Sequence, residues 1–126
     1  MKLACIDIGL KRIGLAICLQ GDIVTPLPAI LRKNRNQASN DVLKVLDEWE
    51  IDTLIVGYPS ASLDMQKRIK HFVNLLDFKK EVIFQEENMS SIEAEDLMKG
   101  DIKYKRDGRV DSLAAKIILE RYLSKN

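Results

Sequence analysis

The sequence predicts an α/β fold, in which a mixed five-stranded sheet carries helices on both faces. Two apolar runs, "ACIDI" and "IGLAI", surround a short turn near the N-terminus, and a third run with two prolines follows them. Farther along the chain, short apolar runs alternate with stretches whose apolar residues recur at helical spacing. An antiparallel meander followed by βα units gives a mixed sheet. The chain of 126 residues has the size of one domain, and we expect residues 1–126 to form it.

Each expected element has its own signal. Pro26 and Pro28 suit the third strand to an edge of the sheet, because proline cannot donate a hydrogen bond to a neighbouring strand. The fourth strand is apolar throughout, as a strand covered on both faces should be. Ser90 and Glu93 fit a capping box that opens a short helix. The expected strands are residues 2–9, 13–19, 22–31, 53–59 and 80–87, and the expected helices are residues 37–49, 63–76, 90–98 and 110–123.

The first two strands predict a hairpin with a turn at residues 10–12. If this hairpin is symmetric, Asp7 pairs with Ala16 and Cys5 pairs with Cys18. These are the only two cysteines of the chain, and we expect both to be reduced thiols in the core.

The charges of the chain are nearly balanced. Its net charge is +1, with 46% hydrophobic and 31% charged residues, so it has no global nucleic-acid signature. No apolar run approaches the roughly 20 residues of a membrane span, and the N-terminus lacks a signal-peptide pattern, so we expect a cytoplasmic protein. Residues 31–37 and 99–109 are locally basic. Such segments can contact phosphates, or they can be solvated loops.

Acidic residues at three places in the chain do not fit the core pattern. Asp7 stands inside the first apolar run, where a lone carboxylate is costly. Glu86 and Glu87 stand where the last strand ends, at the edge where α/β sheets bind ligands. Asp111 opens the final helix in line with its apolar stripe. Each has a simpler interpretation, because Asp7 could accept bonds from the turn amides, the glutamates could be solvated, and Asp111 could be an N-cap.

Taken together, the acids indicate a cation site. Converging carboxylates repel one another unless cations neutralise them. Hard oxygen ligands select Mg²⁺ or Mn²⁺, and two such ions about 3.5–4 Å apart can promote phosphodiester cleavage. The single histidine, His71, lies within an expected helix, and no Cys-His pair has zinc spacing.

The motifs make the chain similar to a known family. The segments "IDIGLKRIGLAI", "PLPAI", "IVGYP", "EENMSS" and "VDSLAAKIILE" occur in the order and spacing of the YqgF/RuvX family, and the resemblance covers nearly the whole chain. Members are described as Holliday-junction resolvases and as nucleases for the 5′ end of pre-16S rRNA, with an RNase H-like fold. The resemblance implies metal-binding catalytic carboxylates at Asp7, Glu87 and Asp111, with Glu86 as the alternative to Glu87.

The chain departs from the family pattern at several positions. Asn88 stands where the family has arginine, and Glu86 stands where it has aspartate. Loss of the arginine removes a possible phosphate contact. The segment "SASLDMQ" also differs from the usual loop after the Gly-x-Pro motif.

The leading hypothesis is a metal-dependent nuclease that hydrolyses structured nucleic acid, with pre-16S rRNA as its substrate and a two-metal site. We expect a monomer or weak homodimer without a membrane partner. The alternatives are a Holliday-junction resolvase acting on branched DNA and an inactive nucleic-acid-binding protein, which the Asn88 departure keeps open. The expected phosphate contacts are Lys11, Arg12, Lys103, Lys105, Arg106 and Arg109.

A second class of function is an ATP-using domain of the actin and sugar-kinase kind. The segment "DIGLKRIG" resembles the first phosphate loop of such enzymes. They need two lobes and an adenosine site, for which 126 residues leave no room.

Overall fold

The computed structural model describes residues 1–86 and 108–125, and the side chains of residues 1–86 and 111–125. Its five strands form one sheet in the order β3-β2-β1-β4-β5. Strands β1, β2 and β3 pair antiparallel, whereas β4 pairs parallel with both β1 and β5. The elements are β1 (Leu3–Ile8), β2 (Arg12–Cys18), β3 (Thr25–Leu31), α1 (Arg35–Glu48), β4 (Thr53–Tyr58), α2 (Leu63–Leu76), β5 (Glu81–Glu86) and α4 (Gly108–Ser124).

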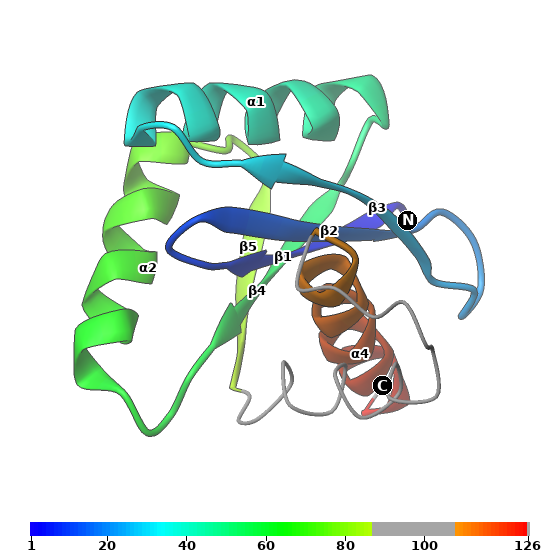
Figure 1. The fold of residues 1–126 in the computed structure, drawn as a ribbon. Coiled ribbons are helices and arrows are strands. Elements are labelled where there is room, and N and C mark those ends of the chain that lie inside the picture. The colour runs from blue at the N-terminus through cyan, green and yellow to red at the C-terminus, as the bar shows by residue number, and fades with distance from the viewer. Residues whose placement is uncertain (87–107, 126) are drawn as a thin grey trace, which may run out of the picture.

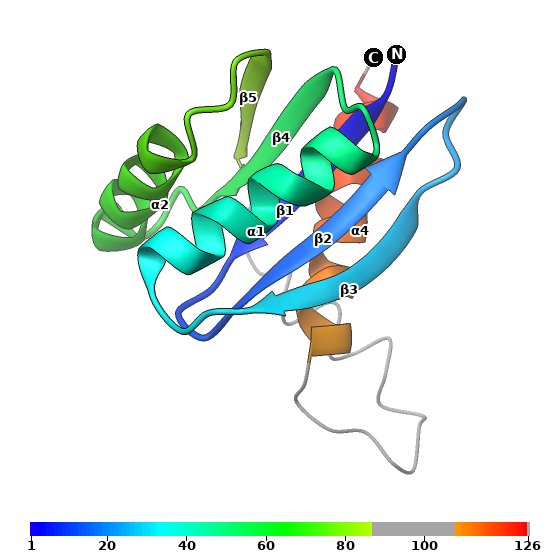
Figure 2. The same cartoon turned by 90° about the horizontal axis from the view of Figure 1, so that it is seen from above.

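Helices cover both faces of this sheet. Figure 1 shows α1 on one side of the strands and α4 on the other, and Figure 2 shows α1 in front of the sheet with α4 behind it. The predicted fold class, a mixed sheet between helices with a leading meander, is therefore confirmed. The proline-containing strand β3 lies at an edge, and the apolar strand β4 lies inside the sheet, as expected.

The alternation of side chains along β1 divides the core into two clusters. Ala4, Ile6 and Ile8 pack with the apolar faces of α1 and α2. Leu3 and Cys5 point the other way, into the cluster that α4 completes. Because side chains alternate along a strand, Asp7 belongs to the α4 face.

The described helices begin where the sequence provides caps. Asn34 accepts a bond from the backbone N–H of Gln37 and forms a capping box with it, so α1 begins two residues earlier than expected. Ser62 caps α2, because its side chain accepts a bond from the backbone N–H of Met65. Trp49, the last residue of the expected helix 37–49, stands at the C-cap of α1 and is 38% exposed.

The register of the first hairpin differs from the symmetric expectation. Asp7 pairs with Gly14 rather than Ala16, and Cys5 pairs with Ala16 rather than Cys18. The cause is a tighter turn, in which the Gly9 N–H donates to the Arg12 carbonyl over 3.0 Å. Because the shift is two residues, every side chain keeps its expected face.

Both cysteines are buried and free, as predicted. The expected helix at 90–98 and the greater part of the basic segment 99–109 lie outside the described residues. The final helix starts at Gly108, two residues before the expected position. Among the described residues, no helix has the length and hydropathy needed to cross a membrane.

Candidate active site

Asp7 stands between two glycines on the α4 face of the sheet. Gly14 is its partner on β2. On the other side, a Cβ placed on Gly57 of β4 would lie 3.8 Å from Asp7 Oδ1 and 2.8 Å from Ile118 Cδ1. At both positions a larger side chain would collide with α4. Asp7 itself is half-buried rather than sealed in the core.

Gly14 also brings the start of α4 against the sheet. A Cβ at this position would stand 1.9 Å from the carbonyl oxygen of Asp111 and 2.8 Å from the Ser112 nitrogen. The backbone of β2 at Gly14 is therefore in direct contact with the backbone of α4, and only glycine permits this contact. Since Asp7 pairs with Gly14, the backbone of Asp111 lies against the ladder partner of Asp7, on the α4 face of the sheet.

Asp111 is bound by an arginine from the neighbouring strand. Arg12 Nε lies 2.9 Å from Asp111 Oδ2, and their side chains are only 27% and 16% exposed. Asp111 is the fourth residue of α4, so the structure does not place it at the N-cap. Its position above Ala115, Ile118 and the packed Tyr122 agrees with the expected apolar stripe.

Ser112 holds three elements together, and the sequence analysis did not single it out. Its hydroxyl donates to the Leu27 carbonyl of β3 over 2.6 Å and accepts from the Leu15 N–H of β2 at 3.3 Å. The side chain is buried. The position of a small hydroxyl residue directly after Asp111 at a helix start was the only available signal.

We expect Ser112→Ala to lower the free energy of unfolding by about 1–3 kcal/mol, because a buried carbonyl and a buried N–H lose their partner. Chemical denaturation measures this change. Ser124→Ala is the matched control, since the Ser124 hydroxyl is exposed and bonds only to Arg121 of its own helix. Equal midpoints for the two variants would contradict the proposed role of Ser112.

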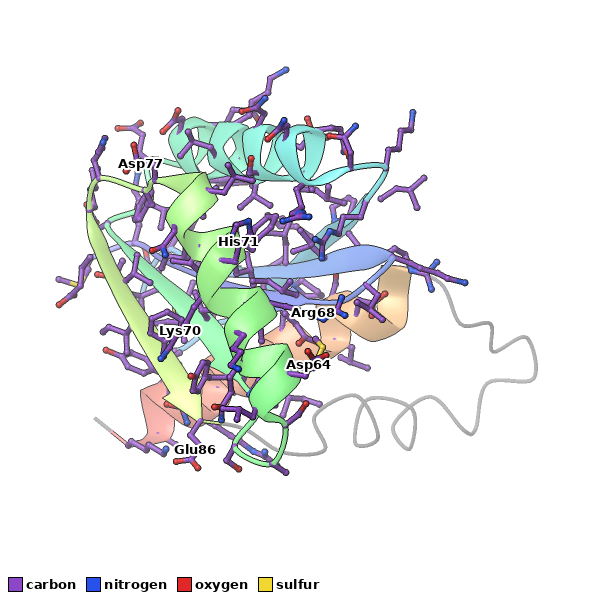
Figure 3. The ribbon with its side chains drawn as sticks, turned by 90° about the vertical axis from the view of Figure 1, so that its left-hand side faces the viewer. Asp64, Arg68, Lys70, His71, Asp77 and Glu86 are labelled. Carbon is purple, nitrogen blue, oxygen red and sulfur yellow. The ribbon has the colours of Figure 1, made fainter. Side chains whose placement is uncertain are left out.

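The acidic end of β5 divides between the two faces. Val82 packs with the α1 and α2 cluster, whereas Ile83 packs with the α4 cluster. By alternation, Glu86 faces the side opposite to Asp7, and the buried Gln85 faces the side of Asp7. Figure 3 shows Glu86 at the end of β5. Glu87, the preferred ligand of the pair, lies outside the described residues.

The buried thiol of Cys5 lies on the same face of the sheet as Asp7. Burial, reinforced by the Asp7 carboxylate two residues away, raises the pKa of the Cys5 thiol well above its usual value. Both effects favour the neutral thiol over the thiolate.

The described donors fit part of a hard-cation site. Within residues 1–86 and 111–125, no group of three histidine, cysteine, aspartate or glutamate side chains is close enough to hold a metal ion. Asp7 and Asp111 supply two carboxylates on one face, which is the donor chemistry that Mg²⁺ and Mn²⁺ prefer. Of the expected phosphate contacts, Lys11 is exposed in the β1–β2 turn and Arg12 binds Asp111. The side chains of Lys103, Lys105, Arg106 and Arg109 are outside the described set.

Comparison with known proteins decides the family. The model of the family described as "RuvX: Holliday junction resolvase" matches residues 1–125. The chain belongs to the RuvX family. Its resemblance to YqgF/RuvX sequences is thereby confirmed.

RuvX-family relatives match it over their full length. A protein of Sulfurovum sp. (strain NBC37-1), named "Putative pre-16S rRNA nuclease", is 58% identical over 98% of this chain and 99% of its own. A protein of Sulfurimonas denitrificans with the same name is 56% identical, covering 98% of this chain and 97% of the relative. The predicted nuclease class agrees with these names and with the family.

Two solved structures show that the RuvX-family fold is RNase H-like. RuvC of T. thermophilus in complex with a Holliday junction substrate has a TM-score of 0.64 at 16% identity, covering 99% of this chain and 94% of that one. The Fowlpox virus resolvase, in complex with Holliday junction DNA, has a TM-score of 0.62 at 15% identity, covering 99% and 98%. At these identities the likeness extends to the fold alone.

Proposed function

We propose that this protein is a divalent-metal-dependent nuclease that processes pre-16S rRNA in the cytoplasm. The observation that supports the proposal is that Asp7 and Asp111 both adjoin Gly14 on the α4 face, Asp7 through the strand ladder and Asp111 through its backbone. The names of the full-length relatives support the RNA substrate. The family description and the junction-bound resolvases favour branched DNA as the second candidate substrate. An inactive nucleic-acid-binding protein remains the third candidate.

In this proposal Asp7, Asp111 and Glu87 hold Mg²⁺ or Mn²⁺. When bound, these ions supply an activated water and stabilise the leaving oxygen of a phosphodiester. Arg12 compensates the charge of Asp111 within the protein, and it keeps the first turn of α4 against β2. In this proposal Lys11, which is exposed in the adjacent turn, contacts backbone phosphate. One domain, acting as a monomer or weak homodimer, suffices for this chemistry.

We expect the parent protein to cleave a transcript that spans the 5′ end of 16S rRNA in Mg²⁺ or Mn²⁺ and to stop when a chelator is added. Asp111→Asn should fold like the parent but cleave at least about a hundredfold more slowly, because a lost metal ligand removes several kcal/mol of transition-state stabilisation. The measurement is single-turnover cleavage of this transcript and of a four-way DNA junction.

Glu120→Gln is the matched control, because it removes an exposed carboxylate from the same helix, where it pairs with Lys116. It should cleave at the parent rate. If the protein cleaves the junction faster than the transcript, branched DNA replaces pre-16S rRNA as the proposed substrate. If Asp111→Asn and Glu120→Gln cleave alike, the proposed site is wrong.

A further inference from the structure

A basic pocket lies on the other face of the sheet from Asp111. It has a volume of about 440 Å³ and lies between the start of α1, the helix α2 and the β1–β2 turn, with Ile8 in its wall. It belongs partly to the basic segment 31–37, to which the proposed active site assigns no role. The charged and polar side chains that line it are Arg32, Arg35, Lys67, Arg68, His71 and a single carboxylate, Asp64.

Arg32 is held at the back of this pocket by the turn that also borders the proposed active site. Its Nη1 donates to the Gly9 carbonyl over 2.8 Å, and its guanidinium lies 5.4 Å from the centre of the Phe72 ring. Partial burial, together with the charges of Arg35 and Arg68, lowers the pKa of Arg32. Like charges are therefore crowded here, and an anion would relieve their repulsion.

Among the described residues, the other pocket cations have only weak partners. Arg68 Nε pairs with Asp64 at 3.1 Å, but the two side chains are 58% and 78% exposed, so the pair contributes little. Arg35 Nη1 donates to His71 Nε2 at 2.8 Å, a contact that neutralises no charge. Figure 3 shows Asp64 and Arg68 together along one side of α2, with Lys70 on another side of the helix.

We infer that this pocket binds a phosphate group of the nucleic-acid backbone, as a second contact separated from Asp7 and Asp111 by the β1–β2 turn. Arginine presents several N–H donors in a fork that fits phosphate oxygens, and three arginines converge here. Lys11 is exposed in the turn between the two sites, so cations continue from one to the other. The proposed function supplies the identity of the polymer, whereas the phosphate chemistry follows from the pocket itself.

The test is the double variant Lys67→Gln with Arg68→Gln, both exposed residues whose loss should leave the fold intact. Its affinity for the 16S precursor transcript, measured by fluorescence anisotropy with a chelator present, should fall. The slope of log affinity against log salt should become shallower by roughly one to two units, one for each lost phosphate contact. Arg35→Gln is a second, independent variant. It should make the slope of log affinity against log salt shallower by up to about one unit.

The control is Lys70→Gln with Lys79→Gln, which removes the same charge from exposed positions that do not line the pocket. It should keep the parent salt slope. A pocket variant that binds with the slope of this control would overturn the inference. If titrated inorganic phosphate shifts the NMR signals of Lys67 and Arg68 while RNA binding stays equal to the control, the pocket takes small phosphate anions and the nucleic-acid assignment is wrong.

The binding readout is independent of cleavage. If the parent protein binds RNA with the expected pocket dependence but never cleaves it, the pocket inference stands and the proposed nuclease function fails. If cleavage follows the expected dependence on Asp111 while both double variants bind alike, the proposed nuclease function stands and the pocket inference fails.

Discussion

We expect Asp7→Asn to abolish cleavage while leaving the fold intact. Asparagine has nearly the same shape and fits the space between Gly14 and Gly57, but it lacks the negative charge that a hard cation needs. The loss should exceed about a hundredfold, since several kcal/mol of transition-state stabilisation depend on the ligand. In metal-free buffer the melting temperature should rise, because the repulsion between Asp7 and Asp111 is removed.

Melting curves of both proteins with and without Mg²⁺ separate this role from a structural one. The parent protein should gain stability from Mg²⁺, whereas the Asp7→Asn variant should gain much less. Asp47→Asn, at an exposed site on α1, is the control and should behave like the parent in every respect. If Asp7→Asn instead melts lower and Mg²⁺ changes neither protein, Asp7 serves as an acceptor in the hairpin.

The second large effect is expected from Gly14→Ala. The new Cβ would stand 1.9 Å from a backbone oxygen of α4, and a backbone atom cannot rotate out of the way. The start of the helix must move away from β2, which also separates Asp111 from Arg12 and Ser112 from Leu27. We expect the free energy of unfolding to fall by at least about 3 kcal/mol, and the remaining folded protein to cleave poorly.

Gly21→Ala provides the comparison for Gly14→Ala. Gly21 has a φ of +64° but nothing within 4 Å of its Cβ position, so the variant measures backbone strain alone. It should cost about 1 kcal/mol and keep full activity. Urea denaturation of the two variants gives the difference. A Gly14→Ala variant as stable as Gly21→Ala would show that α4 is not fixed by its contact with β2.

Much of the fold could be read from local patterns, because apolar periodicity and prolines act within a few residues. Pro26 and Pro28 placed β3 at the edge correctly. The hairpin register could not be read in this way, since it depends on a single hydrogen bond from Gly9 to the Arg12 carbonyl. The sequence analysis expected Asp7 opposite Ala16, whereas the ladder pairs it with Gly14.

The candidate site was only partly accessible from sequence. Asp7 and Asp111 were recognisable because each interrupts an apolar pattern. Their actual neighbours were not, because the pair between Arg12 and Asp111 spans 99 positions and the contact of Ser112 with Leu27 spans 85. The face of Glu86 was readable in principle from the alternation that begins at Val82, whereas the place of Glu87 remains a prediction.

The single described helix on the α4 face has a consequence for biosynthesis. Ribosomes add about 5–20 residues per second, so β1 and β2 are made several seconds before residues 108–124. During that interval Asp111 has not yet been made. The apolar side of the sheet, formed by Leu3, Cys5 and Ala16, is not yet covered by Ala115 and Ile118. A nascent chain of this protein therefore lacks the proposed site, and it needs protection from aggregation until its last helix emerges and docks.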